Sequence, residues 1–352
     1  MSGIIKMKKM VAIDLFCGAG GLTRGFLDAG IEVLAGVDFD SDAKKTYEYN
    51  NKVPYIQEDI RNITAKKIKE IFAQAKDCIK ILAGCAPCQP FSSINKKEIS
   101  TDFRRTLLDE FGRLVNGVKP HIVLMENVPG IAKKSPEVLQ RFLSILNKNG
   151  YKYDFKVLNA KNFGVPQSRN RFILVASRIK GFFPKLLEKS IDKIRTPRDC
   201  IAHLEALKAG EKSVRDPLHF SANMNEANLM RIKNTPKDGG TRMSWGNHVP
   251  KLECHKKTSG YQDAYSRIWW DRPAPTITTK FYQYCSGRHG HPEQDRALSL
   301  REGALLQTFP ENYIFFGSIA TIARQIGNAV PPLMNREIVK TILDYPRQNL
   351  HT

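Results

Sequence analysis

A cysteine in a short, stiff segment is the residue of this chain best suited to covalent chemistry. Cys88 lies in the segment 84–92, GCAPCQPFS, directly after an apolar run at residues 79–83 that is typical of a buried strand. Prolines flank Cys88 and Gln89, restrict the backbone and end the strand. A thiol on a rigid loop at the carboxyl end of a strand lies where open α/β sheets bind ligands. We therefore interpret Cys88 as a nucleophile rather than as a buried packing residue.

A carboxylate and two guanidinium groups downstream are candidates for acid–base and anion-binding roles. Glu126 follows an apolar run at residues 121–125, so we expect it at the end of a second buried strand. Arg169 and Arg171 are two residues apart at the start of a further strand, so their side chains share one face. The alternatives are a strand-end carboxylate that pairs with a lysine and a pair of charges on an edge strand.

A glycine turn near the N-terminus suits a nucleotide-like ligand. Residues 18–21, GAGG, follow an apolar run and precede a helical pattern, although they spell neither G-x-G-x-x-G nor a P-loop. Asp38 ends the next predicted strand, where an acid can accept hydrogen bonds from ribose hydroxyls. Asp59 ends the third and could accept from an adenine amino group. The alternative is a tight turn with two surface acids.

The elements that position these residues are predicted to be alternating strands and helices. Strands are expected at 11–16, 32–37, 54–57, 79–83 and 121–125, and helices at 22–29, 41–49 with Ser41 as the cap, 65–76 and 136–149. This alternation favours a parallel sheet covered by helices. Residues 153–158 and 171–176 are predicted to pair as strands, and a last helix is expected at 332–343, with Pro346 past its end.

The composition is that of an ordinary globular protein with a strong excess of positive charge. The 352 residues suffice for one large domain and a smaller one. Lys and Arg number 55 against 35 Asp and Glu, a formal net charge of +20, which favours phosphate-rich partners. The segment 178–296 is more basic per residue than the rest and has little periodicity, so we expect it to form a second domain.

Neither a metal site, a disulfide framework nor a membrane segment is predicted. The seven cysteines are scattered along the chain. Cys85 and Cys88 form a lone C-x-x-C pair, and no further ligands that zinc would need lie near it. A redox-active dithiol is an alternative role for this pair, and a weak one. No apolar run approaches the roughly 18 residues of a membrane span. Residues 1–10 lack the apolar core of a signal peptide. We expect a cytosolic protein.

Six segments, in this order along the chain, resemble the motifs of the bacterial DNA (cytosine-5) methyltransferases of restriction–modification systems. They are residues 14–22 (DLFCGAGGL), 87–89 (PCQ), 126–128 (ENV), 167–171 (QSRNR), 301–310 (REGALLQTFP) and 327–332 (GNAVPP). A match to one motif arises easily by chance, whereas six in order are highly specific. The resemblance covers nearly the whole chain.

The resemblance implies an α/β fold with two domains. An S-adenosylmethionine-dependent, Rossmann-like sheet domain would comprise residues 1–180 and 322–352. A smaller, irregular target-recognition domain would comprise residues 181–321, with a cleft between the two. In the family, the C-terminal helix returns to the sheet domain, which is why its predicted boundaries are discontinuous.

The resemblance also implies sequence-specific methylation of cytosine C5 in double-stranded DNA, with S-adenosylmethionine as donor and S-adenosylhomocysteine as product. The thiolate of Cys88 would attack C6 of a cytosine flipped out of the duplex, which makes C5 electron-rich. Glu126 would donate a proton or a strong hydrogen bond to N3, and Arg171 would bind O2. Arg169 would help to hold the neighbourhood of Glu126 and Cys88.

Further site residues follow from the resemblance and from the ends of the predicted strands. Those expected at the cofactor are Asp14, Phe16, Gly18, Ala19, Gly20, Gly21, Leu22, Asp38, Phe39, Asp59, Ile60, Pro87, Asn328, Ala329 and Val330. Those expected at DNA are Gln89, Ser92, Thr276, Thr278, Arg242, Lys257 and Arg288, of which the last three are candidates chosen for side-chain type alone.

The implied biological role is the protection of DNA from a cognate restriction endonuclease, which would be a functional rather than a physical partner. We expect a monomer that is associated with the nucleoid through DNA and makes no contact with a membrane. The alternatives are an RNA cytosine-5 methyltransferase and a non-catalytic DNA-binding protein. The glycine spelling and the lack of an Asp/Asn/Ser-Pro-Pro-Tyr/Phe motif argue against a nicotinamide dehydrogenase and an exocyclic-amine methyltransferase.

Overall fold

The computed structural model describes residues 9–86, 106–188, 193–253 and 263–348, and the chain forms two compact units. Unit 1 comprises Met1–Asn159, Asn170–Lys189 and Val330–Thr352, and unit 2 comprises Ala160–Arg169 and Ser190–Ala329. The compact units differ from the predicted domains because residues 160–169 and 322–329 belong to unit 2 and residues 181–189 to unit 1. The functional division of the chain stays a prediction.

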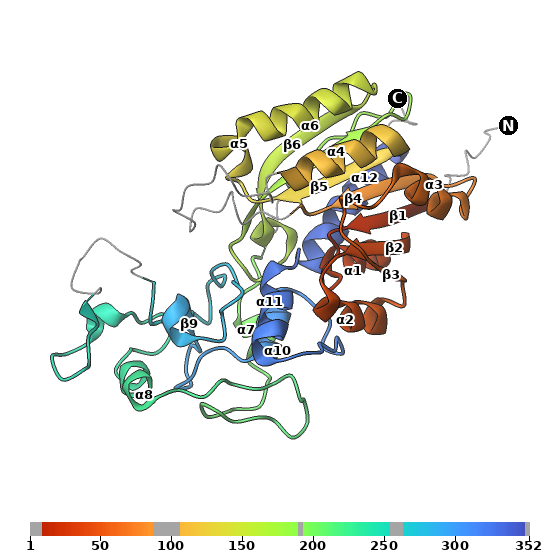
Figure 1. The fold of residues 1–352 in the computed structure, drawn as a ribbon. Coiled ribbons are helices and arrows are strands. Elements are labelled where there is room, and N and C mark those ends of the chain that lie inside the picture. Colours follow the sequence, from red (N-terminus) through yellow and green to blue (C-terminus); the bar gives the residue numbers. More distant parts are fainter. Residues whose placement is uncertain (1–8, 87–105, 189–192, 254–262, 349–352) are drawn as a thin grey trace. The chain divides into compact units, whose positions relative to one another are not determined.

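Unit 1 is built on a seven-stranded sheet with the strand order β3-β2-β1-β4-β5-β7-β6 (Figure 1). Its strands are β1 (Met10–Leu15), β2 (Glu32–Asp38), β3 (Tyr55–Gln57), β4 (Ile79–Gly84), β5 (Ile122–Asn127), β6 (Lys152–Asn159) and β7 (Asn170–Ser177). The first five are parallel to one another, whereas β7 is antiparallel to both β5 and β6. The predicted parallel sheet and the predicted strand pair are thus confirmed. The carboxyl ends of β1, β2, β4 and β5 lie at one edge, where such sheets bind ligands.

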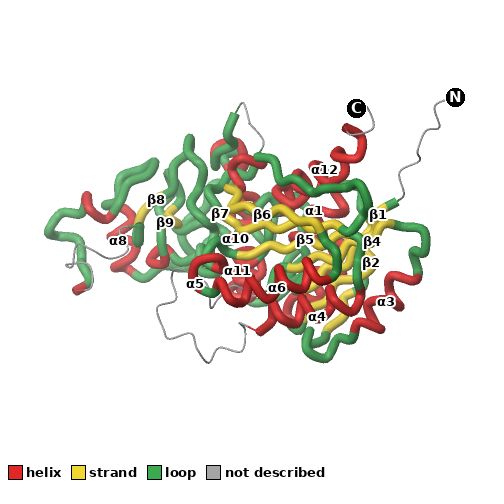
Figure 2. The backbone as a smooth tube through the Cα atoms, turned by 90° about the horizontal axis from the view of Figure 1, so that it is seen from above, coloured by secondary structure: helices red, strands yellow, loops and turns green. Residues whose placement is uncertain are grey.

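Two helical layers cover this sheet, as Figure 2 shows. The helices of unit 1 are α1 (Gly21–Asp28), α2 (Ser41–Asn51), α3 (Ala65–Ala73), α4 (Leu107–Val118), α5 (Ile131–Lys134), α6 (Pro136–Lys148) and α12 (Pro332–Gln348). Helices α3, α4 and α6 pack together on one face, and the rings of Phe111 and Phe142 join α4 to α6 with centroids 5.4 Å apart. Helix α1 packs on α12 over the other face.

Several predicted helix boundaries were wrong. Asp40, not Ser41, caps α2, because its carboxylate accepts from the backbone N–H of Asp42 at 3.1 Å. Helix α3 ends at Ala73, and α12 continues through Pro346 to Gln348. Helix α4 was not predicted at all.

The N-terminal and C-terminal helices of unit 1 are in close contact. A side chain at Gly25 of α1 would bring its Cβ to 2.6 Å from the carbonyl oxygen of Pro332, so only glycine allows this approach. The amide of Asn335 donates to the carbonyl oxygen of Leu22 at 2.7 Å. The chain therefore returns at its end to the helix that begins at the glycine turn.

Unit 2 has little regular structure. Its elements are α7 (Arg198–Ile201), α8 (Glu226–Lys233), α10 (Leu300–Leu306), α11 (Ile319–Asn328), β8 (Ser266–Arg267), β9 (Arg288–Gly290) and the 3₁₀ turns η3 (Ala160–Phe163), η4 (Arg242–Ser244) and η5 (Tyr284–Ser286). Buried arginines connect its loops. The fully buried Arg267 donates to the carbonyl oxygens of Ile232, Thr235 and His291 at 2.7 to 3.0 Å. These bonds satisfy carbonyls that a sheet would otherwise pair.

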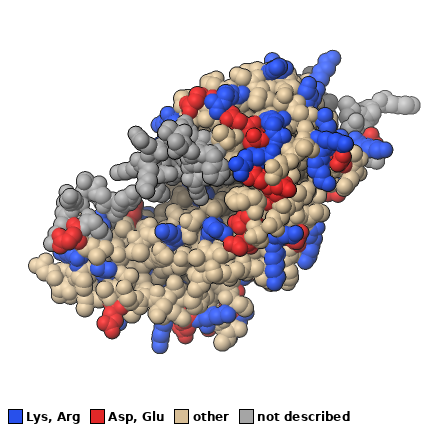
Figure 3. Space-filling view, in the orientation of Figure 1, with Lys and Arg blue, Asp and Glu red and all other residues tan. Residues whose placement is uncertain are grey.

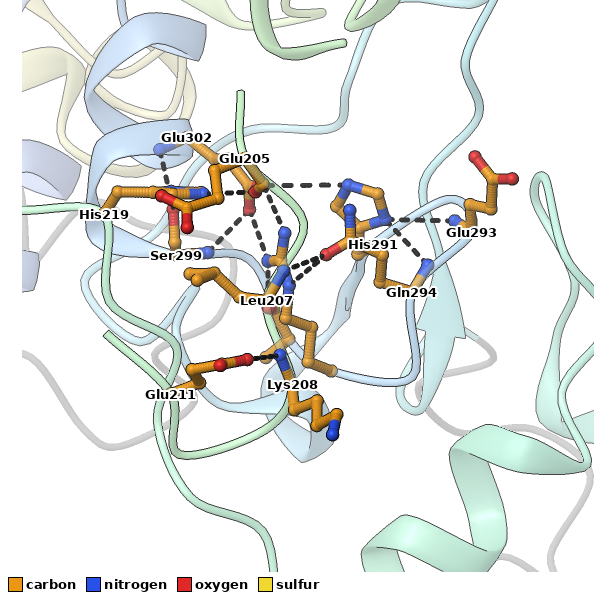
Figure 4. A network of polar contacts seen from close by, with 12 residues as sticks. Glu205, Leu207, Lys208, Glu211, His219, His291, Glu293, Gln294, Ser299 and Glu302 are labelled. Atoms are coloured by element: carbon orange, nitrogen blue, oxygen red, sulfur yellow. Dashed lines mark hydrogen bonds and ion pairs between the residues drawn. The ribbon is translucent and has the colours of Figure 1, made fainter. Parts of the chain in front are cut away.

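A buried polar network fixes the start of α10 (Figure 4). The hydroxyl of Ser299 accepts from the N–H of Glu302, whose carboxylate accepts from the N–H of Ser299 at 2.7 Å. Arg296 donates to both carboxylate oxygens at 2.6 and 2.8 Å. Burial alone would raise the pKa of Glu302, but the adjacent Arg296 guanidinium outweighs it and lowers this pKa to about 2. Glu302 therefore stays ionised inside unit 2.

Charged side chains are interspersed on the surface of unit 1. On the face drawn in Figure 3, lysine and arginine alternate with aspartate and glutamate rather than forming one unbroken basic patch. Within the described parts of the chain, none of the helices combines the length and the apolar character that a membrane span needs.

Candidate active site

Strands β4 and β5 bring the start of the cysteine segment to the end of the strand that carries Glu126. The two strands are parallel neighbours, with Gly84 opposite Met125. The side-chain amide of Asn127 donates to the carbonyl oxygen of Ala86 at 3.2 Å and so fixes the backbone directly before Pro87. Four predicted site residues of the segment that follows, Pro87, Cys88, Gln89 and Ser92, lie outside the described residues.

Glu126 forms a buried ion pair with Arg171. Its Oε1 lies 2.7 Å from Nε of Arg171, and the side chains are 4% and 12% exposed. Arg171 comes from β7, which pairs with β5, so the sheet itself brings the two together. The thiol of Cys85, just past β4, donates to Oε2 of Glu126 at 2.5 Å. The carboxylate is thus held by groups from both neighbouring strands.

Arg169 connects loops within unit 2. Its guanidinium donates to the carbonyl oxygens of Ile277, Gly327 and Ala329 at 3.0 to 3.2 Å. The paired-arginine segment therefore contacts both the 275–279 segment and the last motif. The predicted role of Arg169 beside Glu126 and Cys88 stays a prediction.

Two buried glutamines link the same segments. Gln167 accepts from the N–H of Ile277 at 2.9 Å and donates to Oε1 of Gln307 at 2.9 Å. Gln307 in turn donates to the carbonyl oxygen of Ile326 at 2.7 Å. Neither glutamine was predicted as a site residue, although both lie inside matched motifs. Nothing in the sequence sets either glutamine apart, because both motifs contain other polar residues, such as Arg301 and Glu302 in the case of Gln307.

The glycine turn at the end of β1 is a tight, left-handed structure. Phe16, Gly18 and Gly20 have φ values of 59°, 49° and 90°, of which the last two are readily adopted only by glycine. The N–H of Gly18 donates to Oδ2 of Asp38 at 2.8 Å, so the carboxylate at the end of β2 fixes the turn. Burial raises the pKa of Asp38 above its ordinary value.

Residues beside this turn fit a ligand with a ribose and a flat ring. Asp38 presents a carboxylate at the carboxyl end of β2, and Phe39, which follows it, is 67% exposed. Asp59 follows β3, and Arg61 lies 2.6 Å from it and lowers its pKa through a hydrogen bond. The donor and acceptor set of these residues therefore fits the adenosyl group of S-adenosylmethionine.

The other predicted cofactor residues differ in how deeply they are buried. Asp14 is fully buried and accepts from the hydroxyl of Thr23 at 2.7 Å, which is 3.0 Å from the hydroxyl of Tyr47. Burial raises the pKa of Asp14 to about 7. Five other residues expected at the cofactor are buried, namely Ala19, Gly21, Leu22, Ile60 and Val330. Ala329 is half-buried, and Asn328 is exposed. Their cofactor roles stay predictions.

The predicted DNA contacts of unit 2 differ in accessibility. Arg288 is buried, donates to Asp263 and to the carbonyl oxygens of Gly239 and Arg267, and lies 4.1 Å from the ring centre of Trp269. Its guanidinium therefore holds loops together.

The remaining candidates lie nearer the surface or deeper in the unit. Thr276 is half-buried and donates to the carbonyl oxygen of Ser168 at 3.1 Å, and Thr278 is half-buried. Arg242 is buried, and Lys257 lies outside the described residues. Within the described residues there is no group of three or more His, Cys, Asp or Glu side chains that could hold a metal ion.

The chain is similar to known proteins over most of its length. Residues 10–344 match the C-5 cytosine-specific DNA methylase family. The chain is 42% identical to the Type II methylase M.HgiDII of Herpetosiphon aurantiacus over 94% of each protein. It is 32% identical to the Type II methyltransferase M1.HphI of Haemophilus parahaemolyticus over 97% of this chain and 88% of that protein.

A solved structure has the same fold. The Entamoeba histolytica methyltransferase EhMeth superposes with a TM-score of 0.68 at 18% identity and covers 96% of this chain and 99% of its own. Together with the family match, this likeness confirms the predicted fold class.

Proposed function

Because the chain belongs to the family of C-5 cytosine-specific DNA methylases, we propose that it methylates cytosine C5 at one short sequence of double-stranded DNA. The enzyme class predicted from the six motifs is confirmed by this membership. The observation that carries the finer proposal is the buried Glu126–Arg171 pair beside the loop that leads to Cys88.

In the proposed reaction the target cytosine leaves the base stack and Cys88 bonds to it. The thiolate attacks C6, a new S–C6 bond forms, and the C5–C6 π electrons make C5 nucleophilic. S-adenosylmethionine, when bound, supplies the methyl group as an electrophile. Loss of the C5 proton to a base then restores the C5–C6 double bond as the thiolate leaves.

Glu126 and Arg171 are proposed to stabilise the charge that this attack moves toward N3 and O2. Glu126, once its carboxylate has taken up a proton, would donate that proton to N3, and the guanidinium of Arg171 would bind O2. The ion pair supports this proposal because it holds both groups in one orientation before the base arrives, and a preorganised polar group costs no reorganisation during the reaction.

The glycine turn with Asp38 is proposed to hold the cofactor. Asp38 would accept from the ribose hydroxyls, Phe39 would cover one face of the adenine, and Asp59 would accept from its amino group. The exposure of Phe39 in the protein supports this assignment, because burial of an exposed aromatic ring favours binding.

DNA contacts are proposed for Gln89, Ser92, Thr276, Thr278 and Lys257. Arg242 is a weaker candidate because it is buried, and Arg288 is not among them because its donors are engaged within unit 2. We further propose a cytoplasmic monomer that protects DNA against a cognate endonuclease, a role supported by the Type II names of its relatives.

Bisulfite sequencing of plasmid DNA from cells that express the chain tests the proposal. Wild type should give methylated cytosines in one short motif, Cys88→Ala should give none, and Cys78→Ala, a half-buried cysteine between α3 and β4, should match wild type. Unmodified DNA from folded wild-type protein would instead direct the search to RNA substrates or to a binding role.

The covalent step has its own test. A duplex that carries the motif with 5-fluorocytosine at the target position has no C5 proton to lose, so the S–C6 bond should persist after methyl transfer. A band of protein linked to DNA on a denaturing gel is expected for wild type and Cys78→Ala and not for Cys88→Ala. The absence of this band with wild type would argue against covalent attack.

A further inference from the structure

We infer that Gln283, presented on a turn of unit 2, reads one base edge and sets the specificity for an A·T pair in the recognition sequence. This inference rests on the proposed methylation of DNA. The turn comprises residues 278–288 and is called here the presenting turn. None of its side chains other than those of Thr278 and Arg288 was a predicted DNA contact.

The presenting turn begins at the segment that contacts the paired-arginine motif. The carbonyl oxygen of Ile277 accepts from Arg169 at 3.0 Å. A Cβ at Gly327 would lie 2.5 Å from the backbone of Thr278, so the turn packs directly against the last motif. Its start is therefore fixed to Arg169, which precedes Arg171 by two residues.

Two buried aromatic side chains of the presenting turn anchor it to the rest of unit 2. Phe281 is fully buried against α10, where a Cβ at Gly303 would lie 2.2 Å from its ring. Tyr284 is 2% exposed, and its hydroxyl donates to the carbonyl oxygen of Tyr265 at 2.7 Å. The hydroxyl of Ser286 bonds to the carbonyl oxygens of Lys280 and Gln283 at 2.6 and 2.9 Å and closes the turn.

The backbone groups of Gln283 are bonded within the turn, whereas part of its side-chain amide is available to bind a ligand. Its N–H donates to the carbonyl oxygen of Lys280 at 2.9 Å, and its own carbonyl accepts from Ser286, so its backbone groups are satisfied. Its Nε2 donates to the hydroxyl of Tyr282 at 3.0 Å, which orients the amide. One amide hydrogen and Oε1 have no bond to any residue that the structure describes.

A half-exposed amide with one donor and one acceptor has a specific match in DNA. Adenine presents the N7 acceptor and the N6 donor side by side in the major groove, and glutamine binds both. The hydrogen bond from Gln283 to Tyr282 reduces the entropy lost on binding, as preorganisation does in general. The exposed Lys280 beside it would contact a phosphate, which positions the turn without reading sequence.

A randomised plasmid library, methylated by purified enzyme and read by bisulfite sequencing, tests this inference. Wild type should require an A·T pair at one position of its motif. With Gln283→Ala, discrimination at that position should fall roughly 5- to 150-fold while the other positions are unchanged. Gln283→Glu should move the preference from adenine toward cytosine, whose N4 amino group donates to a carboxylate.

Three further variants separate reading from support. Tyr282→Phe should weaken discrimination at the same position, because it frees the amide. Lys280→Gln should lower binding to all sequences and reduce the salt dependence by about one ion. Cys285→Ser, an exposed substitution in the same turn, should behave as wild type.

The outcomes separate this inference from the proposed function. No methylation of DNA by wild type would overturn the proposed function. Methylation of one motif by wild type, with the same motif and discrimination within twofold in both folded Gln283 variants, would overturn the reading role alone. Tryptophan fluorescence verifies the folding of each variant, because all three tryptophans lie in unit 2.

Discussion

The guanidinium of Arg171 and the carboxylate of Glu126 meet 2.7 Å apart across two antiparallel strands, with Glu126 buried and Arg171 largely so. Each group keeps the other from being an isolated buried charge. Removal of either partner therefore changes both the stability of unit 1 and the orientation of the group that is left.

The two partners should differ in what their loss costs. Arg171→Ala leaves a buried carboxylate without its cation and should lower the free energy of unfolding by about 3–5 kcal/mol. Glu126→Gln keeps the shape, so unit 1 should stay folded, while methyl transfer falls by roughly 10²–10⁴-fold because proton donation is lost. Far-UV circular dichroism during urea unfolding and transfer of radiolabelled methyl groups measure the two effects. An unchanged rate in Glu126→Gln would remove this residue from the proposed mechanism.

The buried glutamine pair should behave as one structural unit. Gln167→Leu and Gln307→Leu should each destabilise unit 2 by about 1–3 kcal/mol, because each leaves buried groups without partners. The double variant should cost less than the sum, since the two side chains bond to each other. Tryptophan fluorescence during denaturation measures these values, and Gln74→Leu on the exposed end of α3 is the control. Strict additivity would contradict the coupling.

Two buried histidines should make unit 2 sensitive to acid. Burial lowers the pKa of His289 to about 4 and of His291 to about 3, the latter despite the nearby Glu302. Both stay neutral in the folded chain at a pH where the unfolded chain, with an ordinary pKa of 6.5, takes up protons. Stability should therefore be complete above pH 6.5 and fall by about 1.4 kcal/mol per pH unit for each histidine between this pH and the folded pKa.

Substitution of His291 tests this slope. His291→Gln should reduce the loss of stability between pH 6.5 and 4, as followed by tryptophan fluorescence. His248→Gln, at an exposed position, should leave the slope as in wild type. Equal slopes in wild type and His291→Gln would assign the acid sensitivity to other groups.

Unit 1 should show the opposite dependence on pH at Asp14. Its pKa, raised by burial from 3.8 to about 7, means that the folded chain holds a proton that the unfolded chain releases above pH 4. Its contribution to stability should decline as pH rises from 4 to 7, by about 4 kcal/mol at most. Asp14→Asn should therefore gain stability relative to wild type between pH 5.5 and 8.5 in thermal unfolding followed by far-UV circular dichroism. Asp77→Asn, at an exposed position, should show no such gain. If the stability of Asp14→Asn differed from that of wild type by the same amount at pH 5.5 and at pH 8.5, the assignment would be contradicted.

The fold of unit 1 could be predicted from local patterns, because its strands carry their own signal. Val11, Ile13 and Leu15 are buried in one run that the sequence shows directly. Helix α4 was not predicted. It contains Gly112, which has a packing role, because a Cβ there would lie 2.6 Å from Ile145. A glycine that permits close packing and one that breaks a helix look the same in a sequence.

The contacts of unit 2 could not be predicted, because they join residues that are distant in the sequence. Arg267 reaches carbonyl oxygens from residues 232 to 291, and none of these partners has a mark that identifies it. The site followed the same rule. The residue types of Glu126 and Arg171 indicated chemistry, whereas their pairing needed the register of β5 and β7.

The contact between α1 and α12 has a consequence for synthesis on the ribosome. The bond between Leu22 and Asn335 joins residues separated by 313 positions. At 5–20 residues per second, the nascent chain takes roughly 16 to 63 seconds to supply the second partner after the first. Throughout that interval the surface of α1 around Gly25 lacks its packing partner α12, so it is accessible to chaperones and to proteases. Helix α1, which is translated long before α12, is therefore among the last elements of unit 1 to reach its mature form.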